Sequence, residues 1–324
     1  MKFADCASLV ELPVAIEHAP DECGLGFVMR SAAANGLTLQ RLLGWLQAAE
    51  PTALQLHDVR RIAYVTRVSA RWLSDRLPQR LFVDGQSGWS FLGEYWSRSI
   101  VFRGREAQVC PQCLHVSGYC RAVWRLATIS ACTKHRQLLV DRCGACGRPI
   151  AWTRPTVDVC QCRRHLKSST DGDAPLLLVQ WSSWVERRVL GAPSPASDSG
   201  LPAWFDLLTV DGASCLVHLM GVRERPHQRI AAATAAHAMD TTTTASQTLR
   251  GLHRLFDLDP DRPETILALS PFIHDAGLQL LARGGTGPGD RRLAERWLAW
   301  VAGRPCTQPT RGGRARNRQL SLFD

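Results

Sequence analysis

The sequence predicts a mainly α-helical protein with a metal-binding module in its middle. Three observations support this prediction. Apolar residues recur at three- and four-residue spacing from Asp21 to Leu81, four close cysteine or cysteine–histidine pairs lie between residues 110 and 162, and helical patterns return after residue 175. We therefore expect a helical bundle with a helix-turn-helix, a two-site zinc-ribbon or zinc-knuckle module, and a C-terminal helical region.

Length and composition limit the classes of protein to which the chain can belong. Its 324 residues, 45% hydrophobic and 21% charged, are typical of a folded globular protein with room for several domains. No apolar run approaches the roughly 18 residues needed to cross a bilayer, and the first residues do not resemble a secretory signal. We expect a cytoplasmic, nucleoid-associated bacterial protein with no membrane partner.

Changes in composition along the chain predict five parts. We expect an N-terminal helical domain over residues 1–107, a double zinc-binding module over 108–167, a helix and linker over 168–200, a C-terminal helical domain over 201–303, and a basic disordered tail over 304–324.

The N-terminal part is expected to form four helices. The first ends at Asn35-Gly36, Thr38 caps the second, Asp58 opens the third, and Ser69 caps a fourth that stops at Pro78. The last two helices have the spacing of a helix-turn-helix, whose second helix lies in the major groove of DNA. The side chains that this helix would present are Arg67, Ser69, Arg71, Ser74 and Arg76.

Arg67 departs from the usual helix-turn-helix pattern. It occupies the turn position where glycine is usual, and a left-handed conformation there costs an arginine roughly 1 kcal/mol. Helix pairs of this kind also occur as structural or protein-binding parts of a bundle. Both interpretations remain open from the sequence.

The cysteine spacing indicates metal binding. A chain without a secretory signal is expected in a reducing compartment, where thiols stay free. Two residues between ligands let a tight turn direct both toward one ion. The four pairs are Cys110/Cys113, Cys132/His135, Cys143/Cys146 and Cys160/Cys162.

We assign the pairs in chain order to two structural Zn²⁺ ions. Cys110, Cys113, Cys132 and His135 form the first predicted site, and Cys143, Cys146, Cys160 and Cys162 form the second. Four protein ligands leave no position for water or substrate, which is typical of a structural site. An interleaved pairing of the ligands remains an alternative. If one of the assigned ligands is wrong, we expect His165 or Cys120 to take its place.

Positive charge gathers in the same segment. Residues 98–168 hold thirteen basic and three acidic side chains, so they carry the whole net charge of +10. An apolar stripe from Tyr119 to Ile129 predicts a helix with Arg121 and Arg125 on another face. We expect these two arginines to contact nucleic acid, although electrostatics does not distinguish DNA from RNA.

Several short motifs follow one another in a distinctive order. They are Leu12-Pro13, Pro20-x-Glu22, Leu25-x-Phe27, Arg30 and Asn35-Gly36, then Cys110-Pro-x-Cys113-Leu114, Tyr119-x-Arg121-x-x-Trp124, Cys132-x-x-His135, Leu138-Leu139, Cys143-x-x-Cys146-Gly147 and Cys160-x-Cys162. This order resembles the TniQ family over roughly residues 10–165. Gly24 stands where the family often has a serine.

The resemblance implies a transposition accessory protein without catalytic activity. Family members bind the AAA+ ATPase that regulates the transposase, and some also bind DNA or a CRISPR RNA-guided complex. Members carry zinc at the matched cysteines and histidine, contain helix-turn-helix units, and in some elements work as homodimers. The implied function is selection of the target site.

Two other functions compete with this hypothesis. A metal-dependent nuclease or recombinase needs clustered carboxylates at an open metal site. The metal segment offers only Glu106, Asp141 and Asp158, widely spaced, and the aspartates at 257, 259 and 261 fit a turn. A stand-alone helix-turn-helix transcription regulator is the main alternative, and it predicts tight sequence-specific binding without a partner.

Overall fold

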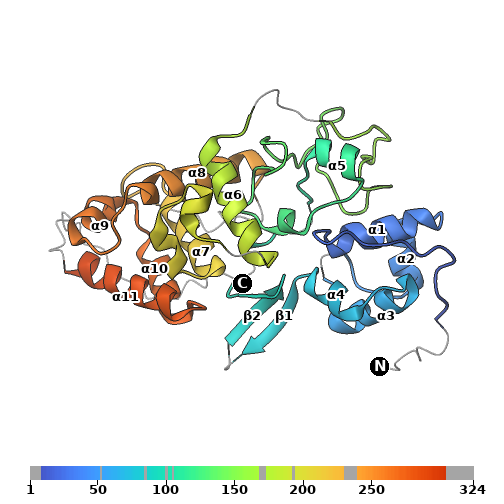
Figure 1. Cartoon of the computed structure of the whole chain (residues 1–324), viewed down its shortest axis with the longest axis horizontal. Coiled ribbons are helices and arrows are strands. Elements are labelled where there is room, and N and C mark those ends of the chain that lie inside the picture. The colour runs from blue at the N-terminus through green and yellow to red at the C-terminus, as the bar shows by residue number, and fades with distance from the viewer. Residues whose placement is uncertain are drawn as a thin grey trace, which may run out of the picture.

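The computed structural model describes residues 9–51, 53–83, 86–98, 101–103, 106–167, 173–191, 194–229 and 239–303. The predicted basic tail, Cys6 and Cys306 lie outside these ranges. The molecule is elongated, with the N-terminal helices at one end and the C-terminal helices at the other (Figure 1). The segment that carries the cysteine pairs lies along one side between them. None of the helices in the described ranges is both long and apolar enough to span a membrane.

The described residues of the N-terminal part form four helices, as the sequence predicts. They are α1 (Gly24–Ala34), α2 (Leu39–Trp45), α3 (Leu56–Thr66) and α4 (Ala70–Asp75). Thr38 caps α2 by accepting a hydrogen bond from the backbone of Arg41 at 3.2 Å. Helix α3 begins two residues before Asp58, because the carboxylate of Asp58 caps the helix by accepting from the backbone N–H of Gln55 at 3.0 Å.

A three-stranded antiparallel sheet follows α4, and the sequence analysis did not predict it. Its strands are β1 (Gln79–Val83), β2 (Gln86–Phe91) and β3 (Glu94–Trp96), in the order β1-β2-β3. The base of the sheet is anchored by Phe91 and Trp96, whose rings lie 5.5 and 5.7 Å from that of Phe102. The signal for this hairpin was the Asp-Gly pair between two short runs containing apolar residues.

The segment between residues 101 and 167 has little regular structure. Besides α5 (Pro111–Ser117) it contains isolated antiparallel bridges, among them Phe102↔Leu126 and Val109↔Val140. The predicted helix from Tyr119 to Ile129 is wrong, because only a 3₁₀ turn, Ala122–Arg125, forms there. The apolar side chains of this segment are buried on several sides of an extended chain. The backbone of the segment forms hydrogen bonds with distant parts of the sequence.

Where the structure describes it, the C-terminal part has six α-helices: α6 (Leu176–Val189), α7 (Val210–Gly221), α8 (Thr241–Phe256), α9 (Pro263–Leu269), α10 (Asp275–Gly284) and α11 (Pro288–Ala302). Helix α6 lies in the segment 168–200 and the other five in 201–303, for both of which the sequence predicts helices. Helices α7 and α8 cross closely, since a Cβ at Gly221 would lie 2.0 Å from the Gln247 carbonyl oxygen, and one at Gly251 would lie 2.0 Å from that of Val217. The mainly α-helical fold class is confirmed.

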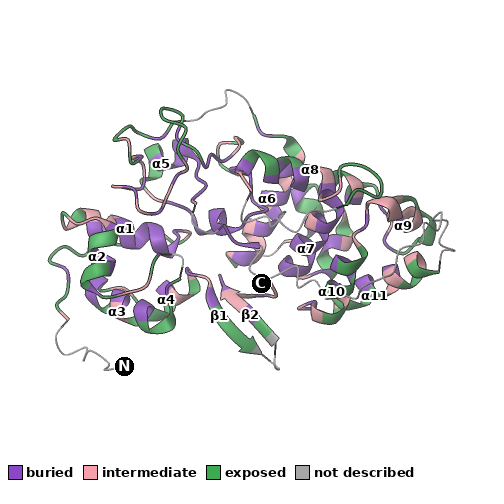
Figure 2. Ribbon diagram, turned by 180° about the vertical axis from the view of Figure 1, so that it is seen from behind, coloured by how far each residue is buried: buried purple, intermediate pink, exposed green. Residues whose placement is uncertain are grey.

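The interior runs through all of these parts. Buried hydrophobic residues form one cluster that extends from Leu12 to Trp297, seen as the purple segments in Figure 2. A buried ion pair joins the middle segment to α8: Arg103 donates to the Asp141 carboxylate at 2.6 Å and to Thr241 Oγ1 at 3.1 Å. The cysteine segment is therefore packed against the helices and not suspended from them.

Candidate metal centres and basic surface

The first four predicted ligands meet at one point. We call Cys110, Cys113, Cys132 and His135 centre 1. Their ligand atoms all lie within 4.8 Å of one another, and each of the three cysteines is at most 1% exposed. Cys110 caps α5 and Cys113 lies in the first turn of that helix, while Cys132 and His135 come from a tight turn.

The second four predicted ligands also meet, nearer the surface. We call Cys143, Cys146, Cys160 and Cys162 centre 2, and their sulfurs lie within 4.8 Å of one another. Cys143 and Cys160 are buried, Cys162 is half-buried and Cys146 is exposed. The structure groups the ligands in chain order and does not interleave them.

The spacing within each centre suits a tetrahedral ion. Zinc–sulfur bonds of about 2.3 Å place neighbouring sulfurs about 3.8 Å apart, whereas a disulfide brings them to about 2.05 Å. The Sγ atoms are 3.8 Å apart in both the Cys143/Cys162 and the Cys146/Cys160 pairs. In centre 1 the distance from Cys113 Sγ is 3.6 Å to Cys132 Sγ and 3.2 Å to His135 Nδ1.

Three of the ligand turns end in the same backbone conformation. Arg136, Gly147 and Arg163 have φ angles of 53°, 68° and 66°. Each donates its backbone N–H to the carbonyl of the cysteine that opens its turn, at 2.8–2.9 Å. A left-handed residue reverses the chain after the ligands. Two of these positions carry arginines, and both side chains are exposed.

Crowding of the thiols shifts their pKa values. Hydrogen bonds from the Cys110 and Cys113 thiols hold the pKa of Cys132 well below its usual range, and contacts with Cys110 and Cys132 raise the pKa of Cys113. Burial raises the pKa of Cys160 to about 12. At Cys143 burial is outweighed by the backbone amides of Ala145 and Cys146, and the pKa falls to about 7. Four sulfurs this close ionise together only when a cation compensates their charge.

The two proposed substitutes lie elsewhere. His165 Nδ1 is 2.9 Å from a carboxylate oxygen of Asp158, and its side chain is exposed. Cys120 is buried beside Arg154. Neither belongs to a centre.

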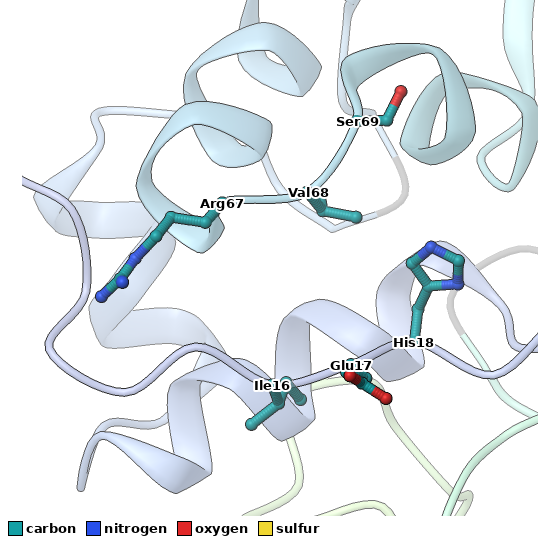
Figure 3. Close-up of a pocket in the computed structure, with 6 residues that line it drawn as sticks. All are labelled: Ile16, Glu17, His18, Arg67, Val68 and Ser69. Atoms are coloured by element: carbon teal, nitrogen blue, oxygen red, sulfur yellow. The ribbon is translucent and has the colours of Figure 1, made fainter.

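Helices α3 and α4 follow each other across a short turn, with Arg67 in the left-handed conformation at φ 56° and ψ 35°. Its guanidinium donates to the backbone carbonyls of Leu12 and Pro13 and pairs with Glu11 at 3.2 Å, so it holds the N-terminal segment against the turn. A small pocket of about 380 Å³ lies between that segment and the turn. Figure 3 shows Val68 and His18 directed into this space, whereas Arg67 extends along the N-terminal segment.

The other predicted contacts of this unit have different environments. The Ser69 hydroxyl caps α4 by accepting from the Trp72 backbone at 3.4 Å. Arg71 is exposed and Ser74 is half-buried. Arg76 is half-buried and donates to the Pro20 carbonyl at 2.9 Å, and burial lowers its pKa. Among the arginines predicted to contact DNA, Arg71 is thus the one whose side chain is most free to do so.

Comparison with known protein families assigns the segment that contains centre 1. Residues 13–139 match the model of the TniQ family. This segment is a TniQ domain. The match confirms the resemblance seen in the sequence motifs, and it ends before centre 2. No curated protein matches the sequence. TniQ proteins are accessory, non-catalytic proteins of transposition, so the match associates the chain with transposition machinery.

Two arginines of the TniQ domain that were predicted to contact nucleic acid are buried. Arg121 is 3% exposed and donates to Asp21 Oδ2 at 2.6 Å, to Thr133 Oγ1 at 3.0 Å and to the Glu186 carboxylate. Its guanidinium therefore joins the start of the TniQ domain, the turn of centre 1 and α6. This burial argues against a contact with nucleic acid, and helical spacing in the sequence does not reveal that a charged side chain has distant acidic partners.

Arg125 is also buried, and burial lowers its pKa to about 10. Its guanidinium lies 5.5 Å from the centre of the Trp152 ring. Neither Arg121 nor Arg125 is positioned to contact a phosphate in this structure.

The exposed positive charge lies instead on the turns around the two centres. We call this set the knuckle surface. It consists of Lys134, Arg136, Arg142, Arg148, Arg163, Arg164 and Lys167, all exposed. The signal in the sequence was their position next to metal ligands, because a ligand turn projects its remaining residues outward.

Proposed function

We propose that this chain is a zinc-stabilised accessory protein of transposition that links target DNA, or an RNA-guided complex, to the AAA+ ATPase that regulates the transposase. The observation that carries the proposal is the presence of two four-ligand centres within and directly after a TniQ domain. Each centre has as many protein ligands as a tetrahedral ion accepts, which favours a structural role over catalysis.

Zinc is the ion that fits these donors best. Centre 1 offers three sulfurs and one imidazole nitrogen, and centre 2 offers four sulfurs. Soft thiolates at tetrahedral spacing favour zinc over calcium, magnesium or manganese, which prefer oxygen ligands. We infer two structural zinc ions.

The knuckle surface is the proposed contact for nucleic acid. Its seven basic side chains lie on or near the ligand turns of the two centres, which would hold the turns in place once the ions are bound. The helix-turn-helix is the second proposed contact. Helix α4 has only six residues. With Arg67 and Arg76 directed to backbone carbonyls, Arg71 is its main free cation among the described residues. This short helix makes an independent sequence-specific regulator the weaker candidate.

Co-purification tests the adaptor function. The full chain loaded with zinc is mixed with the ATPase encoded beside it, with and without target DNA or the guide complex. We expect a stable complex with the ATPase whose yield rises when nucleic acid is present. Tight sequence-specific binding of the chain alone, with no affinity for the ATPase, would establish the transcription regulator instead.

The contribution of α4 is tested by comparing Arg71, which lies on this helix and faces solvent, with Arg67, which precedes the helix and binds the N-terminal segment. Arg71→Gln is expected to weaken binding to DNA and to make its salt dependence shallower by about one unit of slope. Arg67→Gln is the matched control, because this side chain holds the N-terminal segment. It should leave the salt slope unchanged and increase protease cleavage near residues 9–18. Equal slopes for wild type and Arg71→Gln would assign α4 a purely structural role.

A further inference from the structure

Two cysteines outside both centres lie together in the interior. The backbone N–H of Cys23 donates to the Cys120 carbonyl at 2.8 Å, and the adjacent residues Glu22 and Arg121 form an antiparallel bridge. Residues opposite each other in such a pair direct their side chains to the same face. Cys23 and Cys120 are each 1% exposed.

The two side chains share a small space beside Gly26. A Cβ at Gly26 would lie 3.0 Å from both Cys23 Sγ and Cys120 Cβ, so a larger residue there would crowd both cysteine side chains. The two thiols are close enough to shift each other's pKa. The Cα atoms of a hydrogen-bonded antiparallel pair are about 5.5 Å apart, a separation that a disulfide can span.

A buried arginine faces the same sulfur. Arg154 is 0% exposed, and its Nη2 donates to Cys120 Sγ at 3.3 Å. Within the described residues, its other hydrogen bonds go to the carbonyl oxygens of Ala151 and Val157. A buried guanidinium keeps its charge and is costly without an anion. The Cys120 thiolate is positioned to be that anion.

The electrostatics of the pair agree with this geometry. The hydrogen bond from Cys23 and the charge of Arg154 lower the pKa of Cys120, although burial acts in the opposite direction. Burial and the contact with Cys120 raise the pKa of Cys23. The pair therefore combines a nucleophilic thiolate with a neighbouring thiol that keeps its proton.

We propose that Cys23 and Cys120 form a redox modification site that a small hydroperoxide converts to a disulfide. The Cys120 thiolate attacks the peroxide, so that a sulfur–oxygen bond forms, the oxygen–oxygen bond breaks and hydroxide leaves. The Cys23 sulfur then attacks the resulting sulfenic acid. A sulfur–sulfur bond forms, the sulfur–oxygen bond breaks, and the Cys23 proton leaves with the oxygen as water. Two electrons pass from the two thiols to the peroxide.

The disulfide would change the centre of the TniQ domain. It would join the N-cap residue of α1 covalently to the segment between the two ligand pairs of centre 1. It would also remove the negative charge that faces Arg154, leaving the buried guanidinium with its carbonyl hydrogen bonds and the Trp152 ring. Burial of both sulfurs favours a small peroxide over a bulky oxidised thiol as the oxidant.

Peptide mapping of the full, zinc-loaded chain tests the site. After treatment with a few equivalents of hydrogen peroxide and alkylation, we expect a linked Cys23–Cys120 peptide to appear before zinc is released. Cys215 is the matched control, since it is a buried thiol beside Asp211 whose pKa is raised to about 12 by burial. It should react at least tenfold more slowly than Cys120.

Two conservative variants separate the steps. Cys23→Ser should stop the reaction at the sulfenic acid of Cys120, which a 1,3-diketone probe captures. Cys120→Ser should leave Cys23 unmodified at the same dose. The proposal is overturned if zinc release precedes the linked peptide, or if Cys120 reacts no faster than Cys215 in the folded chain.

Discussion

The two centres have equivalent ligand geometry but different surroundings. Centre 1 lies in the interior, and the Thr133 hydroxyl in its second turn donates to Glu186 of α6 at 2.7 Å. Centre 2 has one exposed and one half-buried ligand, and the arginines around it face solvent. An ion at centre 1 would therefore stabilise contacts among three parts of the chain, whereas an ion at centre 2 would mainly order the loops that it joins.

The difference separates two roles that the cysteine pattern alone treats as one. Centre 1 lies inside the TniQ match and is surrounded by core residues. Centre 2 lies outside the match and carries three of the seven residues of the knuckle surface on its own turns, at Arg148, Arg163 and Arg164. We infer that centre 1 serves folding and centre 2 serves presentation of charge. The following predictions test that division.

The largest effect is expected from Cys113→Ser at centre 1. Loss of the ion would leave two buried cysteines and the half-buried His135 without a partner, so we expect the free energy of unfolding to fall by more than about 4 kcal/mol. Chemical unfolding and zinc analysis of the purified chain measure this. The control is Cys215→Ser, a buried cysteine outside both centres, which should keep two zinc ions. A Cys113→Ser chain with two ions and wild-type stability would contradict the assignment.

Acid protonates the ligands of both centres and also lowers the stability of the C-terminal helices. A comparison of the two centres at low pH must separate these two effects. Burial lowers the pKa of His218 in α7 to about 4. The unfolded chain therefore binds this proton first, and the stability from His218 is complete above about pH 6.5 and is lost as pH falls toward 4. The loss amounts to about 3 kcal/mol.

The His218→Gln variant should not show this loss of stability at low pH. A change at His253, which is exposed, should leave the loss as large as in the wild type. Urea unfolding of each variant at pH 7 and pH 4.5, expressed as the difference from wild type, removes the contribution of the centres. Identical pH dependence in wild type and His218→Gln would show that the burial of His218 has no such effect.

Cys146→Ser at centre 2 is expected to have a smaller effect than Cys113→Ser. Because Cys146 is exposed, the variant should lose one zinc ion and about 1–3 kcal/mol while retaining its helices. A chelator should likewise remove zinc in two phases from the wild type and in one slow phase from this variant. Circular dichroism measures the helix content, and a zinc indicator follows the release of the ions. Global unfolding of Cys146→Ser would remove the distinction between the centres.

Charge substitutions sharpen the comparison further. Replacing Arg163 and Arg164 by glutamine should make the salt dependence of nucleic-acid binding shallower by up to about two units of slope, without a change in stability. The matched pair Lys134 and Arg136 at centre 1 tests whether the knuckle surface extends over both centres. Fluorescence anisotropy at several salt concentrations measures the slope. A slope unaffected by either pair would exclude the knuckle surface as the contact.

Local chemistry in the sequence determined the ligands and most of the helices. Two ligands separated by one or two residues meet within a single turn, and capping residues such as Thr38 mark helix starts without help from the rest of the fold. These features depend on neighbours in the chain. They were therefore predictable, as was the mainly helical class.

Only the tertiary structure decided which charged and reactive side chains are free. Arg121 and Arg163 are both arginines of the basic segment, but one pairs with acids from distant segments and the other ends an exposed ligand turn. Cys23 and Cys120 are far apart in the chain and meet through backbone pairing. Burial and pairing depend on contacts between segments that no local pattern encodes. The grouping of the cysteines was therefore predictable from the sequence, whereas the exposure of the charged side chains was not.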